Sequence, residues 1–389
     1  MKRLAVFALV LGLVVCAIPA LAADVAELKI GLVGPMTGPG AQYGQSMKEA
    51  AQLAVDQINS AGGVNGKKVV LFMEDDESNP AKAVSSMQKL ITSDQIAAAV
   101  GHYNSSCTLA SMGVTQRSKV PHLCPISTAA AITAGGNPYI FRNCATNPMQ
   151  VGQLADWVFN NLSKEGQVNR AAVLYENTDY GTGIMEVFVE KVKGNPNWEI
   201  VANESYNPGD TDMVAQLTSI KGKDPGVLLI GGNVTEGAQI VRQAKEIDFP
   251  VQFLALGGLS NDRFPELAGV ENVEGIINVS YFEKDSPNPL AQKFVEAYQK
   301  AYNKDPDMFA AATYEAVDII ANVSKGLGDD SWKSLAKLRQ AITDGISDLD
   351  GLPGVQGPTT FDENGQADKL VYIIRWENGK RVVIFPEGY

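Results

Sequence analysis

The sequence predicts an α/β protein of two doubly wound parallel-sheet lobes, joined by a hinge of crossing strands. Short apolar segments of strand length alternate with amphipathic helical segments along most of the 389 residues. Such alternation is typical of βαβ crossovers, which build a mostly parallel sheet covered by helices on both faces. A second series of the same kind begins after Asn143, and a chain of this length favours two domains.

The first series contains a long amphipathic helix over residues 42–60, whose apolar positions recur at helical spacing. Ala61-Gly62-Gly63 ends this helix. A second helix is predicted over 81–92, and strands are predicted over 28–33, 68–73, 96–100, 122–126 and 139–142.

The second series predicts strands over 170–175, 199–202, 227–230, 252–256 and 275–280, and helices over 149–163, 182–193, 213–221 and 236–247. Two long helices follow over 289–303 and 309–327. Short strands over 370–376 and 380–385 close the chain, on either side of the turn Glu377-Asn378-Gly379. The two series are joined without a low-complexity linker, which favours a hinge made of strands.

The N-terminus has the pattern of a secretory signal peptide. Lys2 and Arg3 precede an apolar run over residues 4–18, and Ala20-Leu21-Ala22 provides a small-residue cleavage site, so we expect residues 1–22 to be removed. The run is too short to span a bilayer. Cys16 raises the alternative of a lipoprotein, which Val15 before it disfavours, and we expect a soluble periplasmic protein that starts at Ala23.

Charge and cysteine content narrow the function further. The net charge of -12 gives no electrostatic reason to bind nucleic acid or anionic lipid. Cys107, Cys124 and Cys144 remain after cleavage, and an oxidising compartment allows one of three pairings. We favour a Cys124–Cys144 disulfide, because both residues lie near the ends of neighbouring predicted strands.

Turns that follow strands are the places where doubly wound sheets bind ligands. The first such turn, residues 34–44, is rich in glycine, but its Gly-x-Gly-x-x-x-Gly spacing departs from the dinucleotide-binding pattern. The third turn, 101–108, opens a helix and carries Ser105 and Ser106, which would hold a carboxylate or simply cap the helix. The fourth turn, 125–129, repeats this chemistry with Ser127 and Thr128, so the pair favours an anion clamp.

The sequence contains no motif that predicts catalysis, a metal site or a bound cofactor. His102 and His122 lack the spacing of metal ligands, and the pair Asp75-Asp76 is better explained as a solvated helix cap. The nucleophile elbow, the zinc-protease motif and the phosphate-binding loop are all missing. We therefore expect a binding protein without a cofactor and not an enzyme.

Several segments in order resemble periplasmic leucine/isoleucine/valine-binding proteins. They include Ile30-Gly-Leu-Val-Gly-Pro-Met-Thr-Gly, Ala61-Gly-Gly-Val-Asn-Gly-Lys and Asp179-Tyr180-Gly181, and the resemblance continues through 101–108, 125–128, 231–232, 241–244 and 309–314. The resemblance implies a type I periplasmic fold with three hinge crossovers. It also implies delivery of the ligand to an ATP-driven (ABC) permease/ATPase complex. On this basis we expect a monomer with an N-terminal lobe of residues 23–145 plus 281–356 and a C-terminal lobe of 146–280 plus 357–389.

The resemblance also implies a set of ligand contacts. Ser105 and Thr128 would bind the ligand carboxylate, and Ile126 and Ser127 would supply nearby backbone contacts. An aromatic wall would come from Tyr43 and Phe309 of one lobe and Tyr180 of the other, with Tyr281 as a further wall residue.

Two positions depart from the family pattern. Gly257 stands where leucine-binding members have a glutamate for the ligand ammonium, and Asn233 stands where a tyrosine is expected. A buried ammonium without a carboxylate would lose several kcal/mol. Asp262 is a candidate substitute, and otherwise the ligand has no ammonium group.

We therefore expect hinge closure around a branched-chain or other apolar amino acid. An amide, a urea-like compound or an aliphatic or aromatic carboxylate is the alternative ligand. A sensor with the same fold and a secreted hydrolase are the alternative functions.

Overall fold

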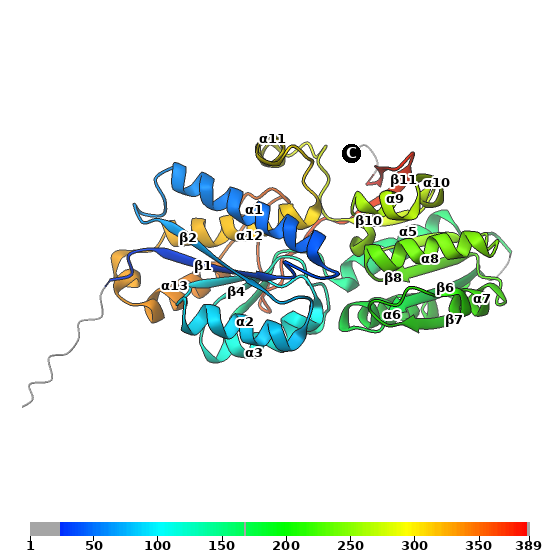
Figure 1. The fold of residues 1–389 in the computed structure, drawn as a ribbon, viewed down its shortest axis with the longest axis horizontal. Helices are drawn as coiled ribbons and strands as arrows, with labels where there is room; N and C mark the ends of the chain where they lie inside the picture. Colours follow the sequence, from blue (N-terminus) through cyan, green and yellow to red (C-terminus); the bar gives the residue numbers. More distant parts are fainter. Residues whose placement is uncertain (1–23, 167–168, 387–389) are drawn as a thin grey trace, which may run out of the picture.

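Two α/β lobes lie side by side in the computed structural model, which describes residues 24–166 and 169–386 (Figure 1). Each lobe is built on its own sheet, one of five strands and one of seven. The predicted fold class is confirmed. The predicted signal peptide with cleavage after Ala22 lies outside the described residues.

The N-terminal lobe contains the five-stranded parallel sheet, in the order β2-β1-β3-β4-β5. Figure 1 shows α1 and α12 above this sheet and α2 and α3 below it. The strands are β1 (Leu28–Gly34), β2 (Val69–Asp75), β3 (Ala98–Gly101), β4 (His122–Cys124) and β5 (Ile140–Arg142). The helices are α1 (Ala41–Ser60), α2 (Pro80–Thr92), α3 (Ser105–Arg117), α4 (Ala131–Ala134), α11 (Pro289–Tyr302), α12 (Met308–Lys325), η2 (Asp329–Lys333) and α13 (Leu335–Ser347).

The C-terminal lobe contains the seven-stranded sheet, in the order β12-β11-β10-β9-β8-β6-β7. Its strands are parallel except for β11, which is antiparallel to both neighbours. They are β6 (Asn169–Glu176), β7 (Trp198–Tyr206), β8 (Val227–Gly231), β9 (Gln252–Ala255), β10 (Ile277–Ser280), β11 (Tyr372–Glu377) and β12 (Lys380–Phe385). The helices are α5 (Asn147–Asn161), α6 (Asp179–Lys193), α7 (Val214–Lys221), α8 (Val234–Glu246), η1 (Gly257–Leu259), α9 (Arg263–Ala268) and α10 (Val270–Val273).

Strand β1 shows why this sequence buries both faces of a sheet. Leu28, Ile30 and Leu32 are fully buried in the large apolar cluster that includes α1, whereas Val33 packs into a separate cluster formed with α2. Because successive side chains of a strand point to opposite faces, an uninterrupted apolar strand requires helices on both sides.

The chain passes between the lobes three times. It leaves β5 for α5, returns from β10 to α11 and α12, and passes from α13 to β11. The third passage runs beside the first, because the N–H of Ala367 donates to the carbonyl of Arg142 over 2.9 Å. Crossings of this kind join two lobes without a flexible linker and form a hinge.

The predicted Cys124–Cys144 disulfide is wrong, because all three described cysteines are free thiols. Cys124 lies in a small cluster with Ala129 and Ile132, whereas Cys144 lies in the large core cluster. The two side chains therefore occupy different apolar environments. Burial raises the pKa of the Cys124 thiol and raises that of the Cys144 thiol to about 12.

We predict that the chain from residue 23 onward contains no disulfide. Thiol titration of protein unfolded without a reductant should count three thiols, whereas the native protein should react slowly, because a buried thiol with a raised pKa is a poor nucleophile. The reduced, unfolded protein is the control. A count of one thiol in the unreduced sample would contradict this prediction.

His122 is buried in its neutral form. Its Nε2–H donates to the carbonyl of Gly101 over 2.7 Å, and its Nδ1 has no partner among the described residues. Burial and the neighbouring His102 lower the pKa of His122 to about 3. The unfolded chain therefore binds a proton below about pH 6.5 that the native protein does not bind.

We predict that His122 makes the protein less stable as the pH falls from 6.5 towards 4. In urea unfolding, the free energy of wild-type unfolding should fall faster than that of His122→Gln, by up to about 1.4 kcal/mol per pH unit. The other titratable groups are the same in both proteins, and at pH 8 the histidine and the glutamine side chains are both neutral. The difference between the two proteins in how the unfolding free energy changes with pH therefore reports on His122. Equal slopes would refute the assignment.

Candidate functional site

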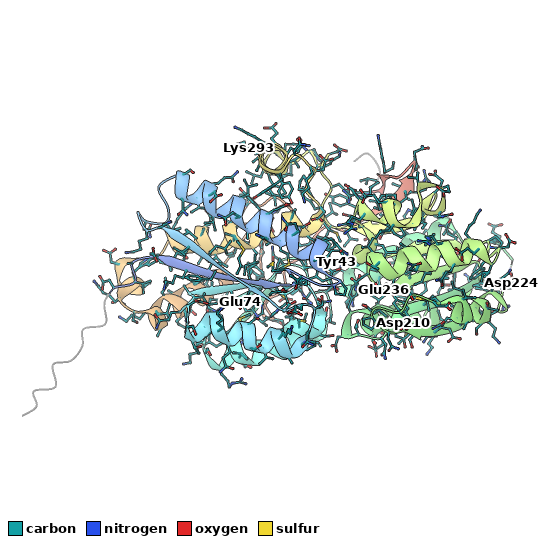
Figure 2. The ribbon with its side chains drawn as sticks, in the orientation of Figure 1. Tyr43, Glu74, Asp210, Asp224, Glu236 and Lys293 are labelled. Carbon is teal, nitrogen blue, oxygen red and sulfur yellow. The ribbon has the colours of Figure 1, made fainter. Side chains whose placement is uncertain are left out.

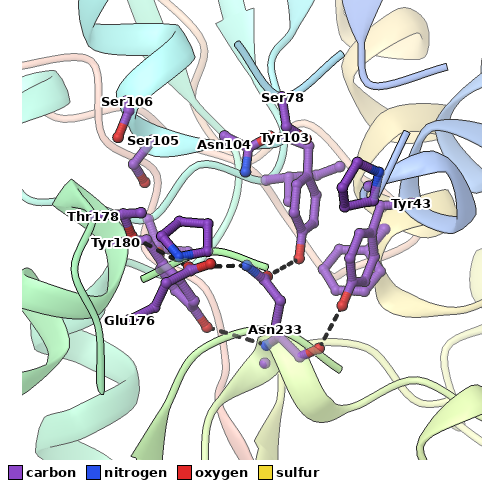
Figure 3. Close-up of a pocket in the computed structure, with 18 of the residues that line it drawn as sticks. Tyr43, Ser78, Tyr103, Asn104, Ser105, Ser106, Glu176, Thr178, Tyr180 and Asn233 are labelled. Carbon is purple, nitrogen blue, oxygen red and sulfur yellow. Dashed lines mark hydrogen bonds between the residues drawn. The ribbon is translucent and has the colours of Figure 1, made fainter. Parts of the chain in front are cut away.

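A cavity of about 350 Å³ lies between the lobes, at the carboxyl ends of strands from both sheets. Figure 2 shows Tyr43 and Glu236 where the two lobes meet, and Figure 3 shows the lining side chains. Their contact with a ligand remains a prediction. The sequence-predicted residues that line the cavity are Tyr43, Ser105, Ile126, Thr128, Tyr180, Asn233, Gly257, Tyr281 and Phe309.

The start of α3 is an uncapped helix N-terminus in the cavity wall. The side chain of Asn104 occupies the N-cap position without making a capping hydrogen bond, and its Oδ1 has no described partner. Ser105 Oγ accepts the N–H of Ala129 over 3.2 Å, so its own proton is left to donate elsewhere. Free N–H groups at a helix start attract an anion, so this end of the cavity suits a carboxylate.

Thr128 and Ser127 differ in what they can offer a ligand. Thr128 donates its hydroxyl proton to Oδ1 of Asn147 over 2.6 Å, which leaves only its lone pairs and its backbone for a ligand. Ser127 does not line the cavity, because its hydroxyl contacts Thr108 at 2.7 Å and the carbonyl of Tyr103 at 3.1 Å. Ser127 therefore holds two turns together from behind the wall.

Three aromatic rings form one wall in the N-terminal lobe. Tyr43 stacks on Tyr103 with 4.0 Å between ring centroids, and Phe309 meets both rings edge-on at 5.1 and 5.6 Å. Such contacts rigidify an apolar surface. Sequence analysis missed Tyr103, although this residue lies in the turn over 101–108 that was singled out.

Both tyrosines of this wall connect the lobes. The Tyr43 hydroxyl donates to the carbonyl of Gly258 over 2.9 Å and accepts the N–H of Val234 over 3.0 Å. The Tyr103 hydroxyl donates to Oδ1 of Asn233 over 2.6 Å (Figure 3). Burial raises the pKa of Tyr43 to about 12, so its proton stays in place at physiological pH. These bonds hold the lobes in a closed arrangement.

Neighbouring side chains fill the space beside Gly257. A Cβ on Gly257 would lie 2.7 Å from Met308 Cε and 3.1 Å from Gln150 Oε1. The Nε2 of Gln150 donates to the carbonyl of Ala145 over 2.7 Å, which fixes the amide with its oxygen near Gly257. A glutamate at position 257 would therefore clash unless Met308 moved.

Glu176 and Glu236 also line the cavity, and sequence analysis missed both. Glu176 ends β6 and Glu236 lies in the first turn of α8, so both are at the edge where strands lead into helices. Oε2 of Glu176 accepts from Nδ2 of Asn233 over 3.0 Å. Burial and the nearby charge of Glu236 raise the pKa of Glu176 to about 7.

Asp262 does not reach the cavity. Its side chain is 68% exposed and lies 3.5 Å from the guanidinium of Arg381 on the surface of the C-terminal lobe. This exposure removes the structural basis for placing an ammonium group against Asp262.

Asp76, His102 and Ser111 form a buried chain of hydrogen bonds. His102 Nδ1 lies 2.6 Å from Asp76 and its Nε2 lies 2.8 Å from Ser111 Oγ. The order matches that of a hydrolase triad, but all three side chains are fully buried and none lines the cavity. We interpret the chain as support for the turn between β3 and α3.

Residues 24–166 and 169–386 contain no cluster of three or more His, Cys, Asp or Glu side chains that could hold a metal ion. Over the same ranges, none of the helices has the length and apolar character needed to cross a membrane.

Comparison with known sequences finds one family that spans nearly the whole chain. A family model described as periplasmic binding protein matches residues 27–381. A Leu/Ile/Val-binding protein homolog of Brucella melitensis is 31% identical, covering 92% of this chain and 93% of that protein. The leucine-, isoleucine-, valine-, threonine- and alanine-binding protein of Pseudomonas aeruginosa is also 31% identical, covering 91% of this chain and 90% of that protein.

Solved structures share the fold. A branched-chain amino acid transporter substrate binding protein of Streptococcus pneumoniae, in complex with isoleucine, superposes with a TM-score of 0.83 at 30% identity. The match covers 92% of this chain and 99% of that chain. A solute binding protein of R. palustris in complex with benzoate superposes with a TM-score of 0.80 at 21% identity, and the match covers 92% of this chain and 95% of that chain. At this identity the likeness is evidence for a shared fold and for nothing more.

Proposed function

The chain belongs to the periplasmic binding protein family, and we propose that it captures a branched-chain or other apolar amino acid for an ABC importer. The observation that carries the proposal is the cavity between the lobes, which joins an open helix N-terminus to an aromatic wall. A carboxylate suits the helix start, and an apolar side chain suits the stacked rings of Tyr43 and Tyr103.

Closure is the proposed mechanism of capture. The lobes, which we assign as residues 23–145 plus 281–356 and residues 146–280 plus 357–389, would turn about the three chain crossings. The ligand stabilises the closed form, because it contacts both lobes only there. The bonds from Tyr43 to Gly258 and Val234 also exist only when the lobes meet. The closed surface would then be recognised by the permease and its ATPase.

The proposal includes secretion and processing. A signal peptide cleaved after Ala22 would deliver a soluble monomer to the periplasm. We propose no catalytic activity. Ser111, the serine of the triad-like chain, is fully buried and does not line the cavity.

A second ligand class has a specific observation in its favour. The family resemblance implies that Gly257 stands where related proteins have a glutamate, and Met308 and the neutral Gln150 occupy the space beside it. An amide or a carboxylic acid without an ammonium group would meet Gln150 without stranding a charge.

We predict that leucine, isoleucine or valine raises the melting temperature of protein that was unfolded and refolded to remove carried-over ligand. A ligand that binds only the native state stabilises it by about 2.7 kcal/mol at one hundred times its Kd. The screen includes the corresponding amides and des-amino acids. Stabilisation by the amides or des-amino acids but by no amino acid would select the second ligand class. If no compound raised the melting temperature, the proposed function would be refuted.

We predict that Tyr43→Phe weakens the bound ligand's affinity about 5- to 30-fold, because the closed form loses two hydrogen bonds worth about 1–2 kcal/mol together. Isothermal titration with the stabilising compound measures the effect. Tyr139→Phe, which removes a hydroxyl bonded to Gln340 on the surface, is the matched control and should bind normally. Equal affinities in both variants would show that the Tyr43 contacts do not contribute to closure.

A further inference from the structure

The charges that line the cavity are all of one sign. No Lys, Arg or His of the described chain lines it, whereas Glu176 and Glu236 do and are only 4% and 6% exposed. Glu77 also lines the cavity, but it is exposed and forms an ion pair with Lys82. Two buried carboxylates therefore face the ligand space without a cation from the protein, an arrangement that costs free energy unless a ligand compensates it.

Each of the two carboxylates has one oxygen held by the protein and one left open. Oε2 of Glu176 accepts from Asn233 and from the Thr178 hydroxyl, at 3.0 and 3.3 Å. Oε1 of Glu236 accepts the N–H of Gly209 over 3.0 Å. The second oxygen of each accepts no hydrogen bond from any described residue. The side chains are thus fixed in position with acceptor capacity remaining.

A separate observation indicates that a polar ligand completes the cavity. The Tyr281 side chain lines the same cavity and is 3% exposed, and its hydroxyl has no partner among the described residues. Buried hydroxyl groups are nearly always hydrogen-bonded in native proteins. The unpartnered Tyr281 hydroxyl therefore indicates that the ligand carries a polar group in addition to its apolar part.

Glu176 is the last residue of β6, Glu236 lies in the first turn of α8, which follows β8, and Gly257 lies just after β9. β8 lies between β6 and β9 in the sheet, so Glu176, Glu236 and Gly257 lie on adjoining turns of one sheet edge. Met308 and Gln150 fill the space at Gly257, which leaves the two glutamates as the acidic groups of this edge that reach the cavity.

We infer that Glu176 and Glu236 hold a cationic group of the ligand, opposite an anionic group at the start of α3. The ligand is then a zwitterion, an amino acid whose ammonium is bound on β6 and α8 and not beside Gly257. This inference rests on the proposed function and selects its first ligand class.

Proton linkage follows from the same arrangement. Glu236 is the ionisable carboxylate that faces Glu176, and the other titratable groups around the two glutamates are the hydroxyls of Tyr43, Tyr103, Tyr180 and Tyr206. Since the pKa of Glu176 is raised to about 7, part of the ligand-free protein carries a proton there at neutral pH. An ammonium favours the ionised form, so binding below pH 7 releases a proton and affinity rises with pH.

The test compares Glu176→Gln and Glu236→Gln with Glu246→Gln, an exposed change near the end of α8. Titration calorimetry uses leucine and 4-methylpentanoate, its des-amino counterpart, at pH 6 and pH 8. Each cavity variant should lose about 30-fold or more in leucine affinity and keep or gain affinity for 4-methylpentanoate. Glu246→Gln should match wild type. In two buffers of different ionisation enthalpy, wild type at pH 6 should release a proton on binding leucine, and Glu176→Gln should not.

The outcomes distinguish a failure of the proposed ammonium site from a failure of the proposed function. Unchanged leucine affinity in both cavity variants, or wild-type binding of 4-methylpentanoate but not leucine, would overturn the inference and leave the proposed function standing. If no compound of the full screen binds wild type, the proposed function fails and the inference fails with it. Ligand-free melting temperatures at or above the wild-type value would show that the variants fold, because each change removes a charge from a buried like-charged pair.

Discussion

The hydroxyl of Tyr43 is the contact on which the closed arrangement depends most directly. It comes from the first turn of α1 in one lobe and meets the backbone of both Gly258 and Val234 in the other. Backbone partners cannot rotate away, so the bonds define a position of one lobe against the other. The same ring stacks on Tyr103, whose hydroxyl reaches Asn233. This pair of tyrosines therefore forms part of the aromatic wall of the cavity and also joins the two lobes.

The polar ends of the cavity have opposite character and belong to different lobes. The N-terminal lobe presents the uncapped start of α3, where backbone N–H groups favour an anion. The C-terminal lobe presents Glu176 and Glu236, which favour a cation. Opening the hinge would separate these two ends. A molecule that satisfies both ends contacts both lobes, and its binding is coupled to closure by the geometry of the site.

Buried polar contacts hold the turns of the N-terminal lobe in position. His102 bridges Asp76 and Ser111, and the Ser127 hydroxyl contacts Thr108 and the backbone of Tyr103. These bonds connect the turns after β2, β3 and β4 behind the cavity wall. Satisfied networks of this kind rigidify a site, because each broken bond would leave a buried polar group unpaired.

Sequence alone determined the alternation of strands and helices, the two sheets and the turns that carry the site, because hydrophobic period and turn chemistry are local properties. It missed α13, although Leu338, Ile342 and Ile346 recur at helical spacing. Only the tertiary structure showed that Glu176 and Glu236 line the cavity and that Asp262 does not. It also showed that Cys124 and Cys144 are free thiols. Those outcomes depend on how turns far apart in the chain meet, and no periodicity along the sequence records such distances.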